Sequence, residues 1–258
     1  MDIIKAAKLL RDAEDGCFQI EKLTETCPGM SAADAYAVQL ENVRLRKEHG
    51  ERVIGMKIGL TSNAMQDLLG VNEPDYGHLF ENMLLLERDT CSMSGLIQPK
   101  VEGELSFCLN KTLKGPGVTA ADVYEAAAWV TPSIEVVDSR IKDWKITLAD
   151  TIADNGSSAR FMLGGRMSRI ENIDMRLTGM TLEKNGELIS SGTTAEVWGS
   201  PAAAVAWLAN KLSEHGTALE AGSIVMSGAV TAAVPAEAGD VFTVSFQRLG
   251  SVTIKFVK

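Results

Sequence analysis

The spacing of apolar residues changes once along this chain, and that change limits the possible folds more than any other feature. Over the first fifty residues apolar side chains recur at helical spacing, beginning between Ile4 and Leu10. From Arg52 onward they stand in short runs separated by Gly, Pro and Asn, which is typical of sheet. We therefore expect an α+β fold in which a helical N-terminal region, residues 1–75, packs on a β-rich, mainly antiparallel domain, residues 76–258.

The second helix of the N-terminal region has a clear start and end. Ser31 followed three residues later by Asp34 is an N-terminal capping pattern, and Gly50 is a residue that ends helices. Tyr36 and Leu40 stand at the spacing of one apolar face. The sequence therefore predicts a helix between residues 31 and 50.

Two more helices are expected further along. One begins at Thr119, which can cap it, and continues through Val130 to end before Pro132. The other has Ser200 as its cap and Pro201 at its first position.

Strands are expected on either side of these helices. Asn185 and Gly186 supply the positive dihedral angles of a tight hairpin turn between two apolar runs, so antiparallel sheet is implied. The other expected strands are residues 53–58, 83–86, 101–109, 223–227, 241–247 and 252–257.

Composition narrows the class of protein. The net charge of -9 and pI near 5.0, with no run of Lys or Arg, leave no electrostatic footprint for nucleic acid. Neither a secretory signal nor a membrane span is visible, and four sparse cysteines favour reduced thiols, so we expect a cytoplasmic protein. Gly55 and Gly59 lack the spacing of a nucleotide-binding loop, and we expect no nucleotide cofactor.

Two glutamates stand on one face of a predicted strand. Residues alternate along a strand, so Glu102 and Glu104 share the face opposite Val101 and Leu105, about 7 Å apart. Two buried carboxylates at that separation repel each other, and a hard cation such as Mg²⁺, Mn²⁺ or Ca²⁺ removes the conflict. The alternative is a solvated strand face that carries two glutamates by chance.

A third glutamate stands in an apolar segment. Glu135 lies between residues that read as a buried strand, where an unpaired carboxylate is costly. It belongs either to the same cation site or to an ion pair with Arg140 or a lysine.

Five segments, taken in order and spacing, resemble the 2-hydroxypenta-2,4-dienoate hydratase and 4-oxalocrotonate decarboxylase group of the fumarylacetoacetate hydrolase superfamily. The likeness continues over nearly the whole chain. The five segments are Gly55–Ser62, Glu73–Gly77, Gln98–Glu104, Glu135–Ile141 and Ala153–Ser157.

The resemblance implies a mixed β-roll catalytic domain of the type found at the C-terminal end of fumarylacetoacetate hydrolase. It also implies a Mg²⁺ or Mn²⁺ site on the matching Glu102, Glu104 and Glu135. Subunits of the hydratase relatives assemble in rings, so a homo-oligomer is expected, and association with a neighbouring pathway enzyme is a further expectation.

The resemblance also implies roles for polar residues. Lys57 and Asp75 match the family's active-site pair and are assigned to proton transfer and water positioning. The plain alternatives are a strand-edge charge for Lys57 and a turn residue for Asp75. Ser157 and Ser227 are expected to offer donors to a substrate carboxylate, or else to serve as turn or cap residues. Trp144 we interpret as a packing residue.

Within the group, the segment Asp138–Ile146 looks like the hydratase version, whereas Gly164–Met167 and Ala229–Val234 look like the decarboxylase version. Departures from the family pattern are Gly156, where alanine is usual, and Ser200, where many relatives have histidine. The expected substrate is a small 2-hydroxydienoate or 2-oxo acid.

The sequence favours a metal-dependent lyase that hydrates 2-hydroxypenta-2,4-dienoate (2-oxopent-4-enoate) to 4-hydroxy-2-oxopentanoate during the breakdown of aromatic compounds. The alternatives are a metal-dependent 4-oxalocrotonate decarboxylase, an acylpyruvate C–C hydrolase, and a non-catalytic partner protein.

Overall fold

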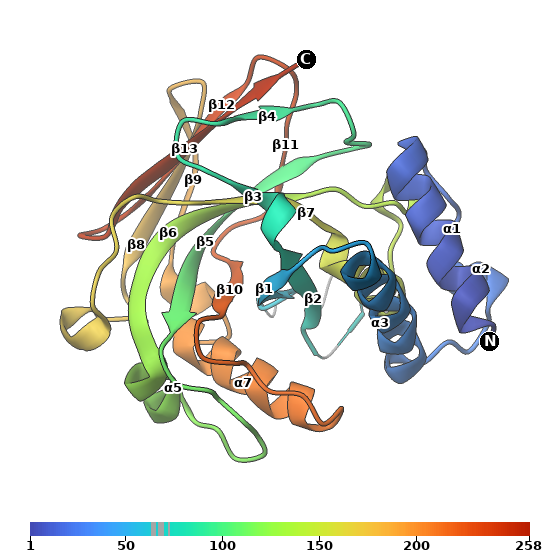
Figure 1. Cartoon of the computed structure of the whole chain (residues 1–258). Helices are drawn as coiled ribbons and strands as arrows, with labels where there is room; N and C mark the ends of the chain where they lie inside the picture. Colours follow the sequence, from blue (N-terminus) through green and yellow to red (C-terminus); the bar gives the residue numbers. More distant parts are fainter. Residues whose placement is uncertain (63–65, 67–69, 72) are drawn as a thin grey trace.

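Two sheets form the body of the protein (Figure 1). The computed structural model describes residues 1–62, 66, 70, 71 and 73–258. One sheet has eight strands, in the order β2 (Asp75–Phe80), β1 (Val53–Gly59), β10 (Ile224–Ala229), β5 (Lys100–Leu109), β6 (Ala127–Val137), β7 (Ser158–Leu163) and β3 (Leu84–Leu85), with β11 (Val234–Pro235) paired to β5. The other has five strands, in the order β4 (Thr90–Ser92), β13 (Gly250–Val257), β12 (Val241–Phe246), β8 (Gly179–Lys184) and β9 (Glu187–Thr193).

Most strand pairs are antiparallel, but β1 with β10, β3 with β7, and β4 with β13 are parallel. The eight-stranded sheet curls into a half-barrel (Figure 1). Strands β12 and β13 of the five-stranded sheet pack against β6 of the eight-stranded sheet. Apolar side chains from both sheets fill the space between them, including Val136, Phe242 and Phe256. The expected α+β class with mixed, mainly antiparallel sheet is confirmed.

Helices cover the sheets at two places (Figure 1). The helices α1–α3 lie together at one side of the molecule, whereas α5 and α7 pack on each other at another. The helix bounds are α1 (Ile3–Gly16), α2 (Leu23–Thr26), α3 (Ala32–Glu48), α5 (Ala120–Ala126), α6 (Leu148–Ala153) and α7 (Pro201–Ser213). The short 3-10 turns are η1 (Glu81–Met83), η2 (Lys142–Trp144), η3 (Asn155–Ser157), η4 (Ile170–Asn172) and η5 (Thr194–Glu196). No helix in the described part of the chain is long and apolar enough to cross a membrane.

The helix α3 begins as the sequence predicted. The Ser31 hydroxyl accepts from the backbone N–H of Asp34, and the Asp34 carboxylate accepts from Ser31 in return. Tyr36 is buried on the inner face of this helix, but Leu40 and, in α1, Ile4 are exposed. The helical part ends at Glu48, and β1 already lies inside the eight-stranded sheet. The division between residues 1–75 and 76–258 stays a prediction.

Two local predictions need correction. The helix expected from Thr119 through Val130 ends at Ala126, because the following residues join β6 and pair with β5, Val130 opposite Phe107. Long-range strand pairing here overrides a local helical spacing. Ser200 does stand at the N-cap of α7, with Pro201 following, but its side chain makes no capping hydrogen bond.

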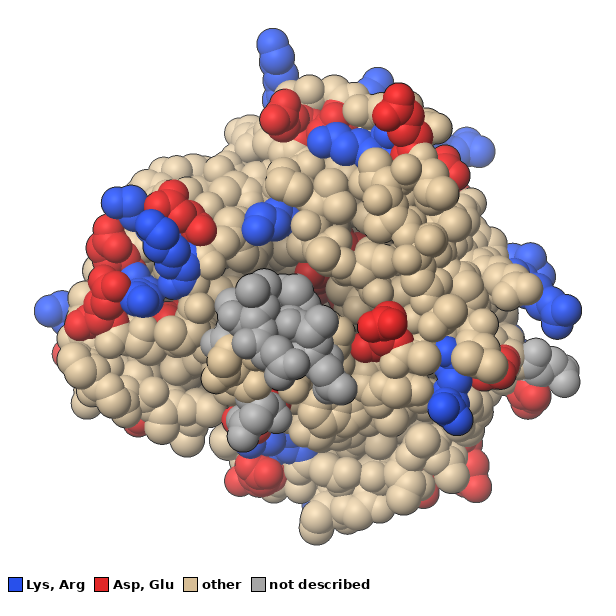
Figure 2. Space-filling view, turned by 180° about the vertical axis from the view of Figure 1, so that it is seen from behind, with Lys and Arg blue, Asp and Glu red and all other residues tan. Residues whose placement is uncertain are grey.

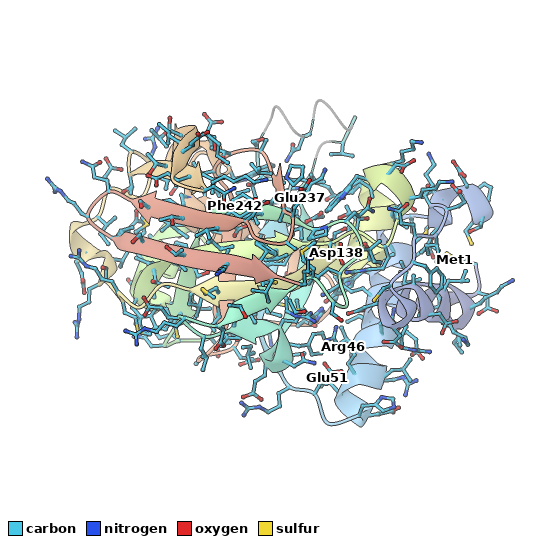
Figure 3. All side chains as sticks on the ribbon, turned by 90° about the horizontal axis from the view of Figure 1, so that it is seen from above. Met1, Arg46, Glu51, Asp138, Glu237 and Phe242 are labelled. Carbon is cyan, nitrogen blue, oxygen red and sulfur yellow. The ribbon has the colours of Figure 1, made fainter. Side chains whose placement is uncertain are left out.

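The hairpin predicted at Asn185 and Gly186 is confirmed. These residues join β8 to β9 with φ values of 56° and 83°, the left-handed conformation that such a turn requires. Figure 3 shows the molecule from above, with Phe242 on β12 of the five-stranded sheet and Asp138 between that sheet and the N-terminal helices. Asp138 accepts hydrogen bonds from the backbone N–H groups of Ile97 and Gln98, so it holds the chain that enters β5.

Candidate active site

Three glutamates meet on the two longest paired strands of the curled sheet. Glu102 of β5 is directly opposite Glu135 of β6, and Glu104 is two residues further along the same face of β5. One carboxylate oxygen from each lies within 4.8 Å of the other two. The cluster that the sequence predicted is therefore present.

These carboxylates have few protein partners. Glu104 is fully buried, and its Oε2 accepts from the backbone N–H of Gly228 at 2.9 Å, but its Oε1 has no hydrogen-bond partner among the described residues. Neither oxygen of the buried Glu135 accepts a hydrogen bond there. Buried carboxylate oxygens without donors are costly, and a divalent cation supplies what they lack. The residues present fit a Mg²⁺ or Mn²⁺ ion.

The pKa values of the three carboxyl groups are all raised. Burial is the main cause, and the charge of Glu135 adds to it for both Glu102 and Glu104. The pKa of Glu102 rises to about 7, and that of Glu104 lies well above its usual range. For Glu135 burial again dominates, while the nearby Lys57 opposes it. The metal-free cluster thus holds protons that a bound cation would displace.

Lys57 and Asp75 stand beside the cluster, on the antiparallel strands β1 and β2. Lys57 Nζ lies 3.6 Å from Asp75 Oδ1 and 3.5 Å from Glu135 Oε2, and it donates to the carbonyl oxygen of Gly156 at 3.0 Å. Glu135 therefore pairs with a lysine and not with Arg140. Burial alone lowers the pKa of Lys57, but Asp75 and Glu135 outweigh burial and raise it overall, so Lys57 remains an ammonium ion.

The two carboxylate oxygens of Asp75 have different partners. Its Oδ2 accepts from the Thr151 hydroxyl at 2.7 Å, whereas Oδ1 has no hydrogen-bond partner among the described residues. A Cβ atom at Gly59, which is opposite Asp75 in the strand pair, would lie 2.3 Å from Oδ1. Only glycine at position 59 leaves room for this carboxylate.

A left-handed turn follows α6 and closes over Lys57. Asn155, Gly156 and Ser157 have φ values of 58°, 60° and 52°. Non-glycine residues rarely adopt this region, and such strain gathers at functional sites. A Cβ at Gly156 would lie 2.8 Å from Lys57 Cδ. The turn therefore limits where the lysine can lie.

A buried network fastens this turn and Asp75 to the N-terminal helices. Asn155 accepts from the backbone N–H of His78 and donates to its carbonyl oxygen, while His78 Nδ1 lies 2.7 Å from Gln39 Oε1. The Gln39 amide of α3 donates to the carbonyl oxygens of Tyr76 at 2.9 Å and Ile152 at 2.6 Å. These two residues adjoin Asp75 and Thr151 in the chain. Sequence reasoning missed Gln39, since only the tertiary fold brings it here.

The site opens into a cavity of about 440 Å³. Figure 2 shows, on one face of the molecule, a depression with acidic atoms at its base, and acidic and basic side chains intermixed around it. The described lining includes Lys57, Asp75, Glu102, Ser157, Thr151, Lys100, Trp144 and apolar residues such as Val137, Ile146 and Val230.

The two serines differ in placement. Ser157 lines the cavity, and its hydroxyl donates to the buried Asp154 carboxylate at 3.0 Å. Ser227 is buried, donates to the carbonyl oxygen of Leu105 at 2.8 Å, and is not among the described residues that line the cavity. Asp154 also binds Arg140, whose Nε lies 2.5 Å from Oδ1. The structure thus brings Ser157 to Lys57 and Asp75 but leaves the Ser227 hydroxyl on the strand backbone.

Trp144 and Lys100 complete the cavity wall. Trp144, interpreted from the sequence as a packing residue, lines the cavity, and Lys100 Nζ lies 4.3 Å from the centroid of its ring. Burial lowers the pKa of Lys100, and the charge of Glu102 partly offsets this. The sequence analysis assigned no role to Lys100. The only signal for one was its position two residues before Glu102, on the same face of the strand.

A cavity with a carboxylate cluster and a lysine–aspartate pair at its base defines an enzyme for a small molecule. The chain belongs to the fumarylacetoacetate (FAA) hydrolase C-terminal family, whose model matches residues 70–257. The resemblance drawn from the five segments is confirmed.

Similar proteins match over the full length. The chain is 45% identical to a 2-hydroxyhexa-2,4-dienoate hydratase of Comamonas testosteroni, over 92% of this chain and 90% of the relative. It is 44% identical to a 2-keto-4-pentenoate hydratase of Burkholderia vietnamiensis, over 99% and 98%. A solved 4-oxalocrotonate decarboxylase from Pseudomonas putida G7, complexed with magnesium and adipate, superposes with a TM-score of 0.96 at 41% identity, covering 99% and 97%.

Proposed function

We propose that this protein is a metal-dependent hydro-lyase that adds water to 2-hydroxypenta-2,4-dienoate, through its 2-oxo tautomer, to form 4-hydroxy-2-oxopentanoate in the breakdown of aromatic compounds. The carrying observation is the buried cluster of Glu102, Glu104 and Glu135 next to the Lys57–Asp75 pair, in a chain 44% identical to a 2-keto-4-pentenoate hydratase along 99% of its length.

The reaction moves a proton from the 2-hydroxyl group to C5, and then adds the hydroxyl group of one water molecule at C4 and a proton at C3. The 2-hydroxydienoate first becomes a 2-oxo-3-enoate, and water then adds at C4 while negative charge builds on the C2 oxygen. A divalent ion held by Glu102, Glu104 and Glu135 would stabilise that charge as a Lewis acid. Mg²⁺ and Mn²⁺ are the proposed ions, because all three ligands are carboxylates.

Lys57 and Asp75 are the residues proposed for proton transfer and water positioning. Against the effect of burial, Asp75 and Glu135 raise the pKa of Lys57 and keep it protonated, so its ammonium group is suited to hold water and to stabilise developing negative charge by hydrogen bonding. The Oδ1 atom of Asp75 accepts no hydrogen bond from the described residues and lies 3.6 Å from Lys57 Nζ, and it is proposed to orient or deprotonate water, while the Thr151 hydroxyl donates to Oδ2. Ser157 is proposed to contact the substrate from the cavity wall. Ser227 is proposed to act through its backbone beside Gly228, which donates to Glu104.

Product analysis tests the proposal directly. Purified protein with Mg²⁺ or Mn²⁺ is expected to convert 2-hydroxypenta-2,4-dienoate to 4-hydroxy-2-oxopentanoate, with ¹⁸O from labelled water entering at C4. No CO₂ should appear from the 5-carboxy analogue. Rapid CO₂ release from that analogue, without hydration of the shorter acid, would replace the hydratase with a decarboxylase.

A metal-dependent 4-oxalocrotonate decarboxylase is the second candidate function. The segment 229–233, which resembles the decarboxylase version, lines the cavity, and a 4-oxalocrotonate decarboxylase superposes closely. Against it, the Ile141–Trp144 segment resembles the hydratase version and also contributes to the cavity through Trp144. The same dienolate is the product of the decarboxylation and the starting point of the hydration, so the cavity wall decides between the two reactions.

A C–C hydrolase is a weaker candidate, since no histidine is among the described residues that line the cavity. We further propose that the protein works in the cytoplasm as a homo-oligomer and associates with a neighbouring enzyme of its pathway. Gel filtration with light scattering would test the oligomer.

A further inference from the structure

Lys100 is the second lysine of the cavity wall, and its contacts differ from those of Lys57. Lys57 lies between two carboxylates, whereas Lys100 forms no ion pair with any described carboxylate. Its ammonium group lies over the face of the Trp144 ring, with 4.3 Å between Nζ and the ring centroid. An ammonium group held on an aromatic face keeps its hydrogen-bond donors available for a ligand.

The loop that carries Trp144 is held in an unusual conformation. Asp143 and Trp144 have φ values of 55° and 57°, a region that such residues rarely adopt. The indole N–H donates to the carbonyl oxygen of Gln98 at 3.1 Å, which ties the ring to the chain just before β5. The tryptophan is therefore fixed beneath Lys100.

Lys100 also stands next to the carboxylate cluster. It shares a face of β5 with Glu102, so the two side chains start about 7 Å apart. The cavity wall includes apolar residues, among them Val137 and Ile146, and polar ones such as Thr61 and Thr231. An anionic group near Glu102 would thus meet the ammonium group of Lys100, which no described carboxylate pairs with.

The charges around the metal site repel an anionic substrate, so a further cation beside the substrate would favour binding. Glu102, Glu104, Glu135 and Asp75 carry four negative charges when a divalent ion is bound, and that ion with Lys57 supplies three positive ones. These groups leave one net negative charge before an anionic substrate enters, and the exposed Glu196, which also lines the cavity, adds another. A further cation beside the substrate offsets that repulsion.

The geometry points to Lys100 as the residue that binds the C1 carboxylate of the 2-oxo acid, with Trp144 holding the ammonium group in place. This inference rests on the proposed function for its substrate class. It makes Lys100 a substrate-binding residue and leaves the proton transfers to Lys57 and Asp75.

Ligand binding tests the inference without turnover. Calorimetry on Mg²⁺-saturated protein compares 2-oxobutanoate, a saturated 2-oxo acid, with its uncharged methyl ester. Lys100→Met should weaken the acid about 10- to 100-fold, the range of one charge-assisted hydrogen bond, and leave ester affinity unchanged. Lys100→Arg should restore most of the affinity. Lys142→Met is the matched control, because Lys142 lies in the same loop as Trp144 but pairs with exposed Glu21.

Each outcome has one meaning. Wild-type affinity of Lys100→Met for 2-oxobutanoate overturns the inference, and so does an equal loss for acid and ester, which would mark a change of shape alone. A selective loss for the acid supports it. If wild-type protein binds the acid through Lys100 yet hydrates no dienoate, the proposed reaction fails and the role of Lys100 stands.

Discussion

Replacing Glu102 with glutamine should stabilise the metal-free protein. The pKa of Glu102 is about 7 in the folded chain, raised from 4.5 chiefly by burial and then by the charge of Glu135. A difference of this size corresponds to about 3 kcal/mol, at about 1.4 kcal/mol for each tenfold change in proton affinity. That figure is an upper limit, since Glu102 keeps some contact with solvent.

The sign of the pH dependence follows from linkage. Below pH 4.5 the Glu102 carboxyl group is protonated in both the folded and the unfolded chain, so it does not change the free energy of unfolding. Between pH 4.5 and 7 the unfolded chain loses this proton first, so the folded state is progressively destabilised. Above pH 7 the full penalty remains. The advantage of Glu102→Gln should therefore grow from near zero at pH 4.5 to as much as about 3 kcal/mol at pH 8.

Urea unfolding of chelator-treated protein between pH 5 and 8 measures this advantage. Glu187→Gln, which changes an exposed carboxylate of β9, serves as the control and should show none. Adding Mg²⁺ at about 1,000 times its Kd should reverse the order, because that concentration stabilises wild type by about 4.1 kcal/mol and the variant has lost a metal ligand. If Glu102→Gln at pH 8 without metal is no more stable than wild type, the electrostatic reasoning is refuted.

Four further predictions follow from the same site. Glu104→Gln should abolish activity and metal binding while the fold persists by circular dichroism, and full turnover after chelation would contradict the metal role. Lys57→Ala and Asp75→Asn should each lower kcat about 10²-fold or more with much less change in metal affinity, and wild-type rates would make both residues structural. His78, whose pKa burial lowers to about 4, should stay neutral by NMR down to pH 5, and its contribution to stability should be lost as pH falls from 6.5 through 4. Gln39→Leu should cost about 2–4 kcal/mol in urea unfolding, because the carbonyl oxygens it serves lose their donors, and a cost below about 0.5 kcal/mol would argue against the network.

Local sequence rules predicted the parts of this protein that depend on one segment. Period-two alternation placed Glu102 and Glu104 on one face of a strand, since successive side chains of a strand point to opposite sides. The start of α3 at Ser31 and the turn at Asn185 were likewise predicted, because a cap or a tight turn is made by neighbouring residues.

The resemblance of the five segments supplied what local rules could not. Residue spacing alone does not place Glu135 next to Glu102. The residues around Glu135 also could not decide between a cation site and an ion pair. The pairing of β5 with β6 settles that these carboxylates are neighbours, while Glu135 also contacts a lysine. Strand register is chosen by packing across the whole sheet, so it is not readable from either strand by itself.

Tertiary structure alone decided the remaining features. Val130 belongs to a strand despite a helical spacing, because pairing with Phe107 satisfies its backbone. The placement of Lys100 over Trp144 and of Gln39 beside His78 joins residues 44 and 39 positions apart. Such contacts depend on how separate elements pack against one another. The sequence by itself determined which side chains share a strand face or cap a helix, and the packed fold determined which of them meet in the cavity, because local backbone geometry fixes only the former.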